Sequence, residues 1–209
     1  MKLETQCSSE RPSITAVQEP VDIRGSTDTR VSDFAIETCR ADDSGPVRRV
    51  LFFEIENDPT RISRVLNVVV EEVARMELAD RPDDFRLRLA LEEALMNAVV
   101  HGNLEVGSDL REAGDGAYER LIERRRHQEK YRGRRVRLTC DLRRDEAVFV
   151  VRDEGIGFDV NRLPDPRSRE RVGRPAGRGV LLMRAFMDEV EFSHGGTVVT
   201  MTVRGRARK

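Results

Sequence analysis

The order of strand-like and helix-like segments is the feature that most constrains the fold of this 209-residue chain. A run rich in aromatic and β-branched residues at 48–57 is typical of a strand, and helix-like segments with one apolar stripe follow it. Two strands are expected at 135–142 and 146–153, then a short helix at 179–187 and a closing hairpin. This order predicts an α+β protein, a two-layer sandwich in which helices cover one face of a mixed, mostly antiparallel sheet.

The chain divides into a polar N-terminal tail and one domain. Residues 1–48 have few apolar positions and no sustained period, which is typical of a disordered tail, or of a start codon assigned too far upstream. The domain is expected at 49–205, with an inserted, charged helical segment at about 104–134.

Charge and composition exclude several classes of protein. The 37 basic residues balance the 38 acidic ones, so the chain has no overall attraction for nucleic acid or an anionic membrane. No apolar run approaches the roughly 20 residues of a membrane span, and the N-terminus lacks a secretory signal, so we expect a cytoplasmic protein. Cys7, Cys39 and Cys140 are scattered without CxxC spacing and are expected to be reduced thiols.

The segment EEALMNAVVHGN at 92–103 places polar groups within an apolar helix. Glu93 and Asn97 lie one turn apart, about 40° from each other around the helix, so both can reach one ligand. Leu89 and Val100 are the nearest residues in angle, and their apolar side chains suggest that this side of the helix is a pocket wall. Seen alone, however, such a pair is more often an ordinary polar surface pair.

A second motif, VVRDEGIGFD, follows the end of an expected strand. The carboxylate of Asp153 can accept a hydrogen bond from an exocyclic amine, and Gly155 and Gly157 allow the backbone to approach a flat ring closely. An aspartate followed by glycine at a strand end is equally typical of a plain turn.

A third motif, AGRGVLLM, places Gly177 and Gly179 on either side of Arg178 at the start of a helix. Unpaired amides, the helix dipole and a guanidinium together favour phosphate binding, although a glycine-rich turn entering a helix has the same composition. Thr197, at the start of the last strand, is a supporting candidate for a bond to a base edge, but a threonine in a strand is more often structural.

These motifs occur in a fixed order: E-x-x-x-N on a helix, a strand followed by DxGxG, a loop, GRG opening a helix, and GT before a strand. This order resembles the Bergerat-type ATP-binding domain shared by gyrase-type topoisomerases, histidine kinases, heat-shock chaperones and mismatch-repair ATPases. The resemblance covers residues 49 to about 204. The small size and the motif EALMNAVVHGN look most like the bacterial anti-sigma-factor serine kinases.

The resemblance implies roles for the individual residues. Asn97 would be the Mg²⁺ ligand, Glu93 the general base and Asp153 the adenine contact, while residues 177–179 would hold the phosphates of ATP. His101, one turn beyond Asn97, lies on the same side and can touch phosphate, but a histidine at a helix end is more often a cap or packing residue.

The resemblance also implies an ATP-dependent protein serine kinase that regulates transcription. Its substrate would be an anti-sigma antagonist protein, and a sigma factor would be its other, mutually exclusive partner. Bound ADP or ATP would order an Arg-rich lid at 158–176 and so select the partner. A homodimer is compatible with this role, and the insertion at 104–134 departs from the family's minimal form.

Two alternatives belong to other functional classes. The first is a nucleotide-regulated binding module that holds ATP and sequesters a partner without transferring phosphate. The second treats the basic segment at 120–137 as a nucleic-acid surface, but glutamates dilute its charge and only two tyrosines are near to stack on bases, so no direct nucleic-acid binding is expected.

Overall fold

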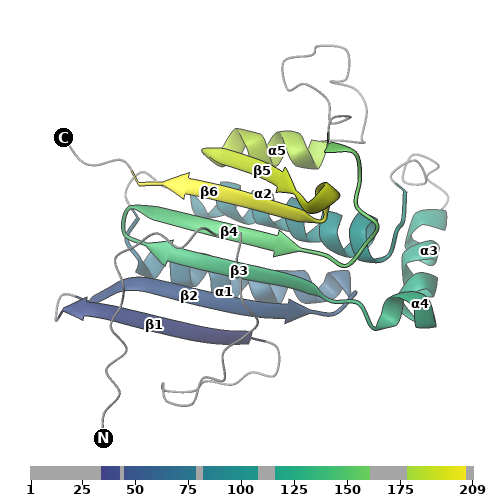
Figure 1. The fold of residues 1–209 in the computed structure, drawn as a ribbon, viewed down its shortest axis with the longest axis horizontal. Helices are drawn as coiled ribbons and strands as arrows, with labels where there is room; N and C mark the ends of the chain where they lie inside the picture. Colours follow the sequence, from purple (N-terminus) through teal and green to yellow (C-terminus); the bar gives the residue numbers. More distant parts are fainter. Residues whose placement is uncertain (1–33, 43–44, 79–81, 108–115, 161–177, 206–209) are drawn as a thin grey trace, which may run out of the picture.

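One sheet of six strands forms a complete layer of the molecule (Figure 1). The computed structural model describes residues 34–42, 45–78, 82–107, 116–160 and 178–205. The strands lie in the order β1-β2-β3-β4-β6-β5, and every pair of neighbours is antiparallel. Their bounds are β1 Phe34–Asp42, β2 Gly45–Ile55, β3 Val136–Arg143, β4 Glu146–Arg152, β5 Glu189–Ser193 and β6 Val198–Arg204.

The alternation of side chains along the strands gives the sheet one buried face. In β3, the apolar residues at every second position are buried, while the residues between them are partly or fully exposed. Cys140 is one of the buried residues, and burial raises the pKa of its thiol, so this cysteine stays protonated and behaves as a small apolar side chain.

Three helices cover the buried face of the sheet: α1 Ile62–Arg75, α2 Asp84–Met96 and α5 Arg178–Phe186 (Figure 1). A 3-10 turn, η1 Pro59–Arg61, leads into α1, and the Asp58 side chain caps it by accepting a hydrogen bond from the Thr60 amide at 3.0 Å. This arrangement of helices on one face of a sheet confirms the predicted α+β sandwich. The sheet is not mixed, however, because every strand pair in the described residues is antiparallel.

The helix that carries EEALMNAVVHGN changes its winding partway along. α2 ends at Met96, and Asn97–Asn103 continue as a π-helix, η2. At its end the Leu104 amide donates to the Val99 carbonyl at 2.9 Å, a bond that spans five residues instead of four. Such π-helical turns are rare and occur frequently at functional sites.

Two further helices, α3 Ala117–Arg126 and α4 Glu129–Arg132, lie at the end of the sheet where β3 begins (Figure 1). They fall in the expected insertion at 104–134, of which residues 108–115 lie outside the described residues.

The predicted tail at 1–48 was wrong in its last part. β1 and the first residues of β2 lie within that range, and β1 pairs with β2 from Phe34 opposite Phe53 to Asp42 opposite Gly45. The strand was missed because its hydrogen bonds to β2 define it, and a search for hydrophobic periodicity does not detect such backbone pairing. Residues 1–33 lie outside the described residues.

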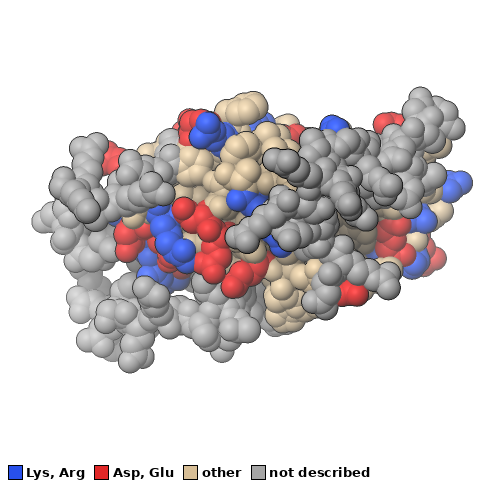
Figure 2. All heavy atoms as spheres, turned by 90° about the horizontal axis from the view of Figure 1, so that it is seen from above, with Lys and Arg blue, Asp and Glu red and all other residues tan. Residues whose placement is uncertain are grey.

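Charges of both signs are mixed on the described surface. Figure 2, which views the molecule from the side of α5 and β5, shows lysines and arginines lying among aspartates and glutamates. Arg204, for example, forms ion pairs with Glu146 and Glu189. Within the described part of the chain, no helix has the length and the apolar character that crossing a membrane requires.

Candidate functional site

A cavity of about 400 Å³ lies between the helices and the sheet, next to the point where β4 ends. This volume falls in the range of small-molecule sites, roughly 300–1,000 Å³. Its walls are mainly apolar and come from α2, η2, β4, α5, β5 and β6. Four polar side chains line it, and all belong to η2 or to the loops after η2 and β4: Asn97, His101, Glu105 and Asp153.

The wall formed by α2 and η2 differs from the prediction. Ala94, Asn97, Ala98 and His101 face the cavity, whereas Leu89 and Val100 were expected there and do not line it. Val100 is fully buried in the hydrophobic core. The prediction assumed about 100° per residue throughout, and the wider turn of the π-helix changes the direction of the residues after Asn97, which explains Val100 but not Leu89, a residue of α2.

Asp153 lies one residue beyond the end of β4, and bonds on both sides hold it there. Its amide donates to the Thr197 carbonyl at 3.0 Å, and its Oδ1 accepts a hydrogen bond from the Gly155 amide at 2.8 Å. Burial raises the pKa of Asp153 to about 6, although the Gly155 bond and the charge of Arg134 both lower it. At neutral pH Asp153 is therefore a carboxylate inside an apolar cavity, suited to accept a hydrogen bond from a ligand.

Glycines allow the segment after β4 to pack directly against η2 and the β5–β6 turn. A Cβ on Gly155 would lie 2.4 Å from the Gly102 carbonyl oxygen, and one on Gly102 would lie 2.5 Å from Asp153 Cγ. Gly157 has a φ of 70°, and a Cβ there would lie 2.1 Å from the Gly195 carbonyl oxygen. The close approach predicted for Gly155 and Gly157 is therefore made in this structure to the protein's own backbone.

Glu93 and Asn97 meet the start of α5. A Cβ on Gly179 would lie 2.6 Å from Glu93 Oε2 and 3.4 Å from Asn97 Nδ2, so the glycine permits this approach. Arg178 is the first residue of α5 and is exposed, while Gly177 lies outside the described residues. Residues 161–176 of the predicted lid at 158–176 also lie outside the described residues.

His101 and Thr197 both form local bonds. His101 lines the cavity, and its Nδ1 lies 2.6 Å from the Val106 carbonyl oxygen, so Nδ1 carries the donated proton and the ring is fixed at the end of η2. The Thr197 hydroxyl donates to the His194 carbonyl at 3.0 Å, which favours the structural role for this residue.

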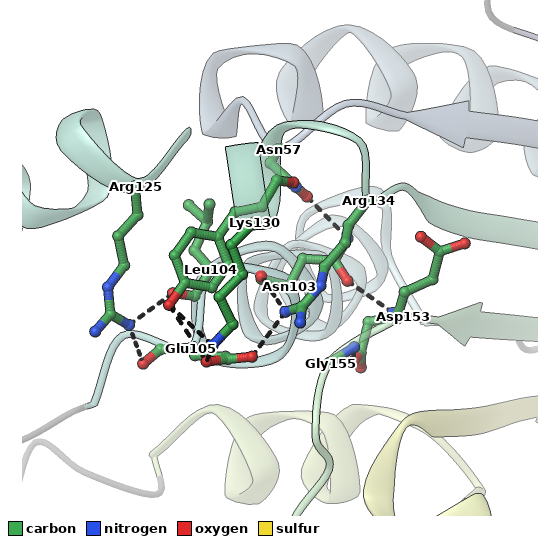
Figure 3. Close-up of polar contacts among 11 residues, drawn as sticks. Asn57, Asn103, Leu104, Glu105, Arg125, Lys130, Arg134, Asp153 and Gly155 are labelled. Carbon is green, nitrogen blue, oxygen red and sulfur yellow. Dashed lines mark hydrogen bonds and ion pairs between the residues drawn. The ribbon is translucent and has the colours of Figure 1, made fainter. Parts of the chain in front are cut away.

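Glu105 lines the cavity, and the sequence did not single it out. Its backbone has a φ of 54°, and its carboxylate binds Lys130 Nζ at 2.7 Å and Arg134 Nη1 at 2.9 Å (Figure 3). The hydrogen bond from Lys130 is the main cause that lowers its pKa. No local motif marks Glu105, because these partners lie 25 and 29 residues along the chain.

Several basic side chains of the insertion bind other parts of the domain. Arg125 donates to the Leu104 carbonyl at 2.8 Å, and Arg126 binds Asp58 at 2.7 Å. Arg125, Lys130 and Arg134 also lie 4.8–5.4 Å from the centre of the Tyr131 ring. These contacts fix α3 and α4 to Asp58 and to the residues that follow η2.

The cavity fits a purine nucleotide with its metal ion. Apolar walls suit a flat base, Asp153 supplies an acceptor, and the start of α5 suits phosphate. The amide oxygen of Asn97 is a suitable Mg²⁺ ligand. No group of three or more His, Cys, Asp or Glu side chains gathers as a metal site among the residues that the structure describes, so an ion at Asn97 would take other ligands from phosphates and water.

Residues 117–203 match the family described as "histidine kinase-like ATPase domain". The matched part is less than half of the 209-residue chain; it includes Asp153 and α5, while Glu93 and Asn97 precede it. The match supports the assignment of this part to the histidine kinase-like ATPase superfamily, and with it ATP binding. No curated protein matches the chain significantly.

Proposed function

We propose that this protein is a Mg-ATP-dependent serine kinase of the anti-sigma regulatory type. One observation carries the proposal: Asn97 and Asp153 line a single cavity, and the start of α5 lies against both Glu93 and Asn97. Three separate segments of the chain thus contribute: the loop after β4 supplies an acceptor for the base, the α2–η2 helix supplies a metal ligand and a carboxylate, and the start of α5 supplies amides for the phosphates.

Each residue takes a role set by its position. Asp153 accepts a hydrogen bond from the adenine amine, and the apolar cavity walls enclose the base. Asn97 holds Mg²⁺, and the amides of the first turn of α5, together with Arg178, bind the phosphates. Bound Mg-ATP supplies the phosphoryl group that is transferred.

Glu93 acts as the general base. Its carboxylate lies beside Gly179 and one turn from Asn97, next to the expected phosphates. It takes the proton of an incoming serine hydroxyl as the serine oxygen bonds to the γ-phosphorus, and ADP leaves with the bridging oxygen.

The partners follow from the motif EALMNAVVHGN, which is similar to the helix motif of the anti-sigma-factor serine kinases. The protein substrate is an anti-sigma antagonist, and a sigma factor is the competing partner, which places the protein in the cytoplasm. The α3–α4 insertion changes the surface available to these partners, so we expect a different mode of contact from that of the minimal family form.

The test compares two isosteric variants of adjacent residues on α2. With Mg-ATP and candidate antagonist proteins, Glu93→Gln should bind nucleotide like the wild type but form phosphoserine at least ~100-fold more slowly. Glu92→Gln is the matched control, because residue 92 is equally half-buried but points elsewhere on the helix, and it should change neither property.

The results separate the kinase from its rival. If the wild type binds Mg-ATP and a partner but forms no phosphoserine with any candidate, the protein is a nucleotide-regulated binding module. If Glu93→Gln transfers phosphate at the wild-type rate, the role of Glu93 as the base is wrong.

A further inference from the structure

Asn103, the last residue of η2, is a fully buried amide at the centre of the polar contacts near the cavity (Figure 3). Its Nδ2 donates to Asn57 Oδ1 at 2.8 Å, and its Oδ1 accepts a hydrogen bond from the Glu154 amide at 2.7 Å. Its backbone carbonyl accepts from Arg134 Nη1 at 2.8 Å. Asn103 thus joins the segment between β2 and η1, the loop after β4 and the segment after α4.

The two ends of this chain of bonds fix the orientation of both amides. Asn57 Nδ2 donates to the Tyr131 carbonyl at 2.7 Å, and a carbonyl can only accept. The oxygen of Asn57 must therefore face Asn103, which directs the Asn103 amide nitrogen to Asn57. The Asn103 oxygen then faces the Glu154 N–H, which can only donate. Flipping either amide would place like groups against each other inside the protein.

Glu154 directly follows Asp153, so a bond to the Glu154 amide constrains the carboxylate that faces the cavity. The Thr197 carbonyl holds Asp153 from the β6 side, and Asn103 holds the next peptide from the η2 side. Without the Asn103 bond, the Glu154 amide would lose its partner, and only the Glu154 carboxylate, through the Arg135 amide and Arg137, would hold this residue from that side.

We propose that Asn103 is a positioning residue for Asp153, and that the Tyr131–Asn57–Asn103–Glu154 bonds couple α4 to the base-binding end of the cavity. This inference rests on the proposed nucleotide function, since it assigns Asp153 to the base. Its consequence is that a partner that moves α4 changes nucleotide affinity.

Two charged groups act on Asp153 in this arrangement: Arg134, which lowers its pKa, and Glu154, which raises it. His101 and Glu105 line the same cavity. Burial is the largest cause of the raised pKa of about 6, so the position of the turn controls this pKa. Release of the turn into water should lower the pKa of Asp153 toward its ordinary value of 3.8.

The experiment uses the full chain and two independent readouts. In Asn103→Ala, calorimetry should show Mg-ATP binding about 5- to 100-fold weaker, because Asp153 is no longer held where its carboxylate can bond to the base. In the nucleotide-free protein, ¹³C NMR titration of the Asp153 carboxyl should show the lower pKa. Val203→Ala, a buried β6 residue in the hydrophobic core, is the control for lost stability and should change neither readout.

Asn57→Ala is the second variant and does not require that Asn103→Ala folds. It frees the Asn103 amide to rotate, so both readouts should shift in the same direction but less. The double variant Asn57→Ala/Asn103→Ala should weaken binding no more than Asn103→Ala alone, because the two residues act in series.

Wild-type affinity and an unchanged Asp153 pKa in Asn103→Ala and Asn57→Ala would overturn the inference. If the wild type binds no nucleotide, the proposed function fails, and the NMR titration still decides whether Asn103 positions Asp153.

Discussion

Gly102→Ala tests the contact between η2 and Asp153. The added Cβ would lie 2.5 Å from Asp153 Cγ and 2.6 Å from its Oδ1, whereas carbon atoms in contact are normally about 3.5–4.0 Å apart. Asp153 would have to move by about 1 Å, and the expected bond to the base would be lost. A hydrogen bond to a charged group contributes about 1.5–3 kcal/mol, so Mg-ATP should bind roughly 10- to 150-fold more weakly.

The matched control is Gly107→Ala, a second glycine that lines the cavity. No atom lies within 4 Å of the Cβ that this change adds, so affinity should stay at the wild-type value. Titration calorimetry measures affinity, and urea unfolding shows whether each variant keeps its stability. Wild-type affinity in a folded Gly102→Ala protein would refute the reasoning, because a carboxylate that moves freely would not be the base contact.

Two further predictions concern charge. The pKa of Asp153 is about 6 in the folded protein, against an ordinary aspartate pKa of 3.8 in the unfolded chain, so the native state binds the extra proton between these values. The contribution of Asp153 to the free energy of unfolding should therefore fall as pH rises through about 4–6, and Asp153→Asn should remove this dependence in urea unfolding; an identical pH profile in both proteins would contradict it. Glu105→Gln should lower the free energy of unfolding by about 1–3 kcal/mol at neutral pH, because it removes the carboxylate that binds Lys130 and Arg134. Since the pKa of Glu105 is lowered in the folded protein, the difference in free energy of unfolding between the wild type and Glu105→Gln should shrink at acidic pH. A difference that stays constant with pH would show that the charge of Glu105 is not its cause.

Most of the fold could be predicted because most of its elements carry a local signal. The alternation in β3 and the stripe of α1 correspond to the structure to within a few residues at each end. β1 was missed because its pairing with β2 defines it as a strand, and no periodic pattern in its own sequence reveals that pairing. The sheet was expected to be mixed, but sequence alone contains no signal for strand direction once connections are long.

The site could be predicted only where its residues lie close together in the sequence. Glu93 and Asn97 are one turn apart, and Asp153 is marked by the glycines after it. His101 was expected on the side of Asn97 and lines the cavity, whereas Val100 was expected there too and is buried in the core instead. Hydrophobic periodicity does not reveal the switch to a π-helix at Asn97, which changes the direction of the residues after it.

The contacts of Asn103 and Glu105 were missed for a different reason. The partners of Asn103 lie 46 and 51 residues away, and those of Glu105 lie in the insertion. Long-range polar contacts of this kind appear only when the sheet and helices bring distant segments together.

The most direct test of the central claim is calorimetric titration of Mg-ATP into the full chain, with Mg-GTP as the comparison and Asp153→Ala as the variant. The account predicts one ATP site per chain and an ATP affinity at least ~10-fold lower in the variant. GTP should bind more weakly, because guanine has a carbonyl oxygen at C6, where adenine has the amine that donates to Asp153. A wild-type protein that binds no ATP, or an Asp153→Ala protein that binds it unchanged, would contradict the account.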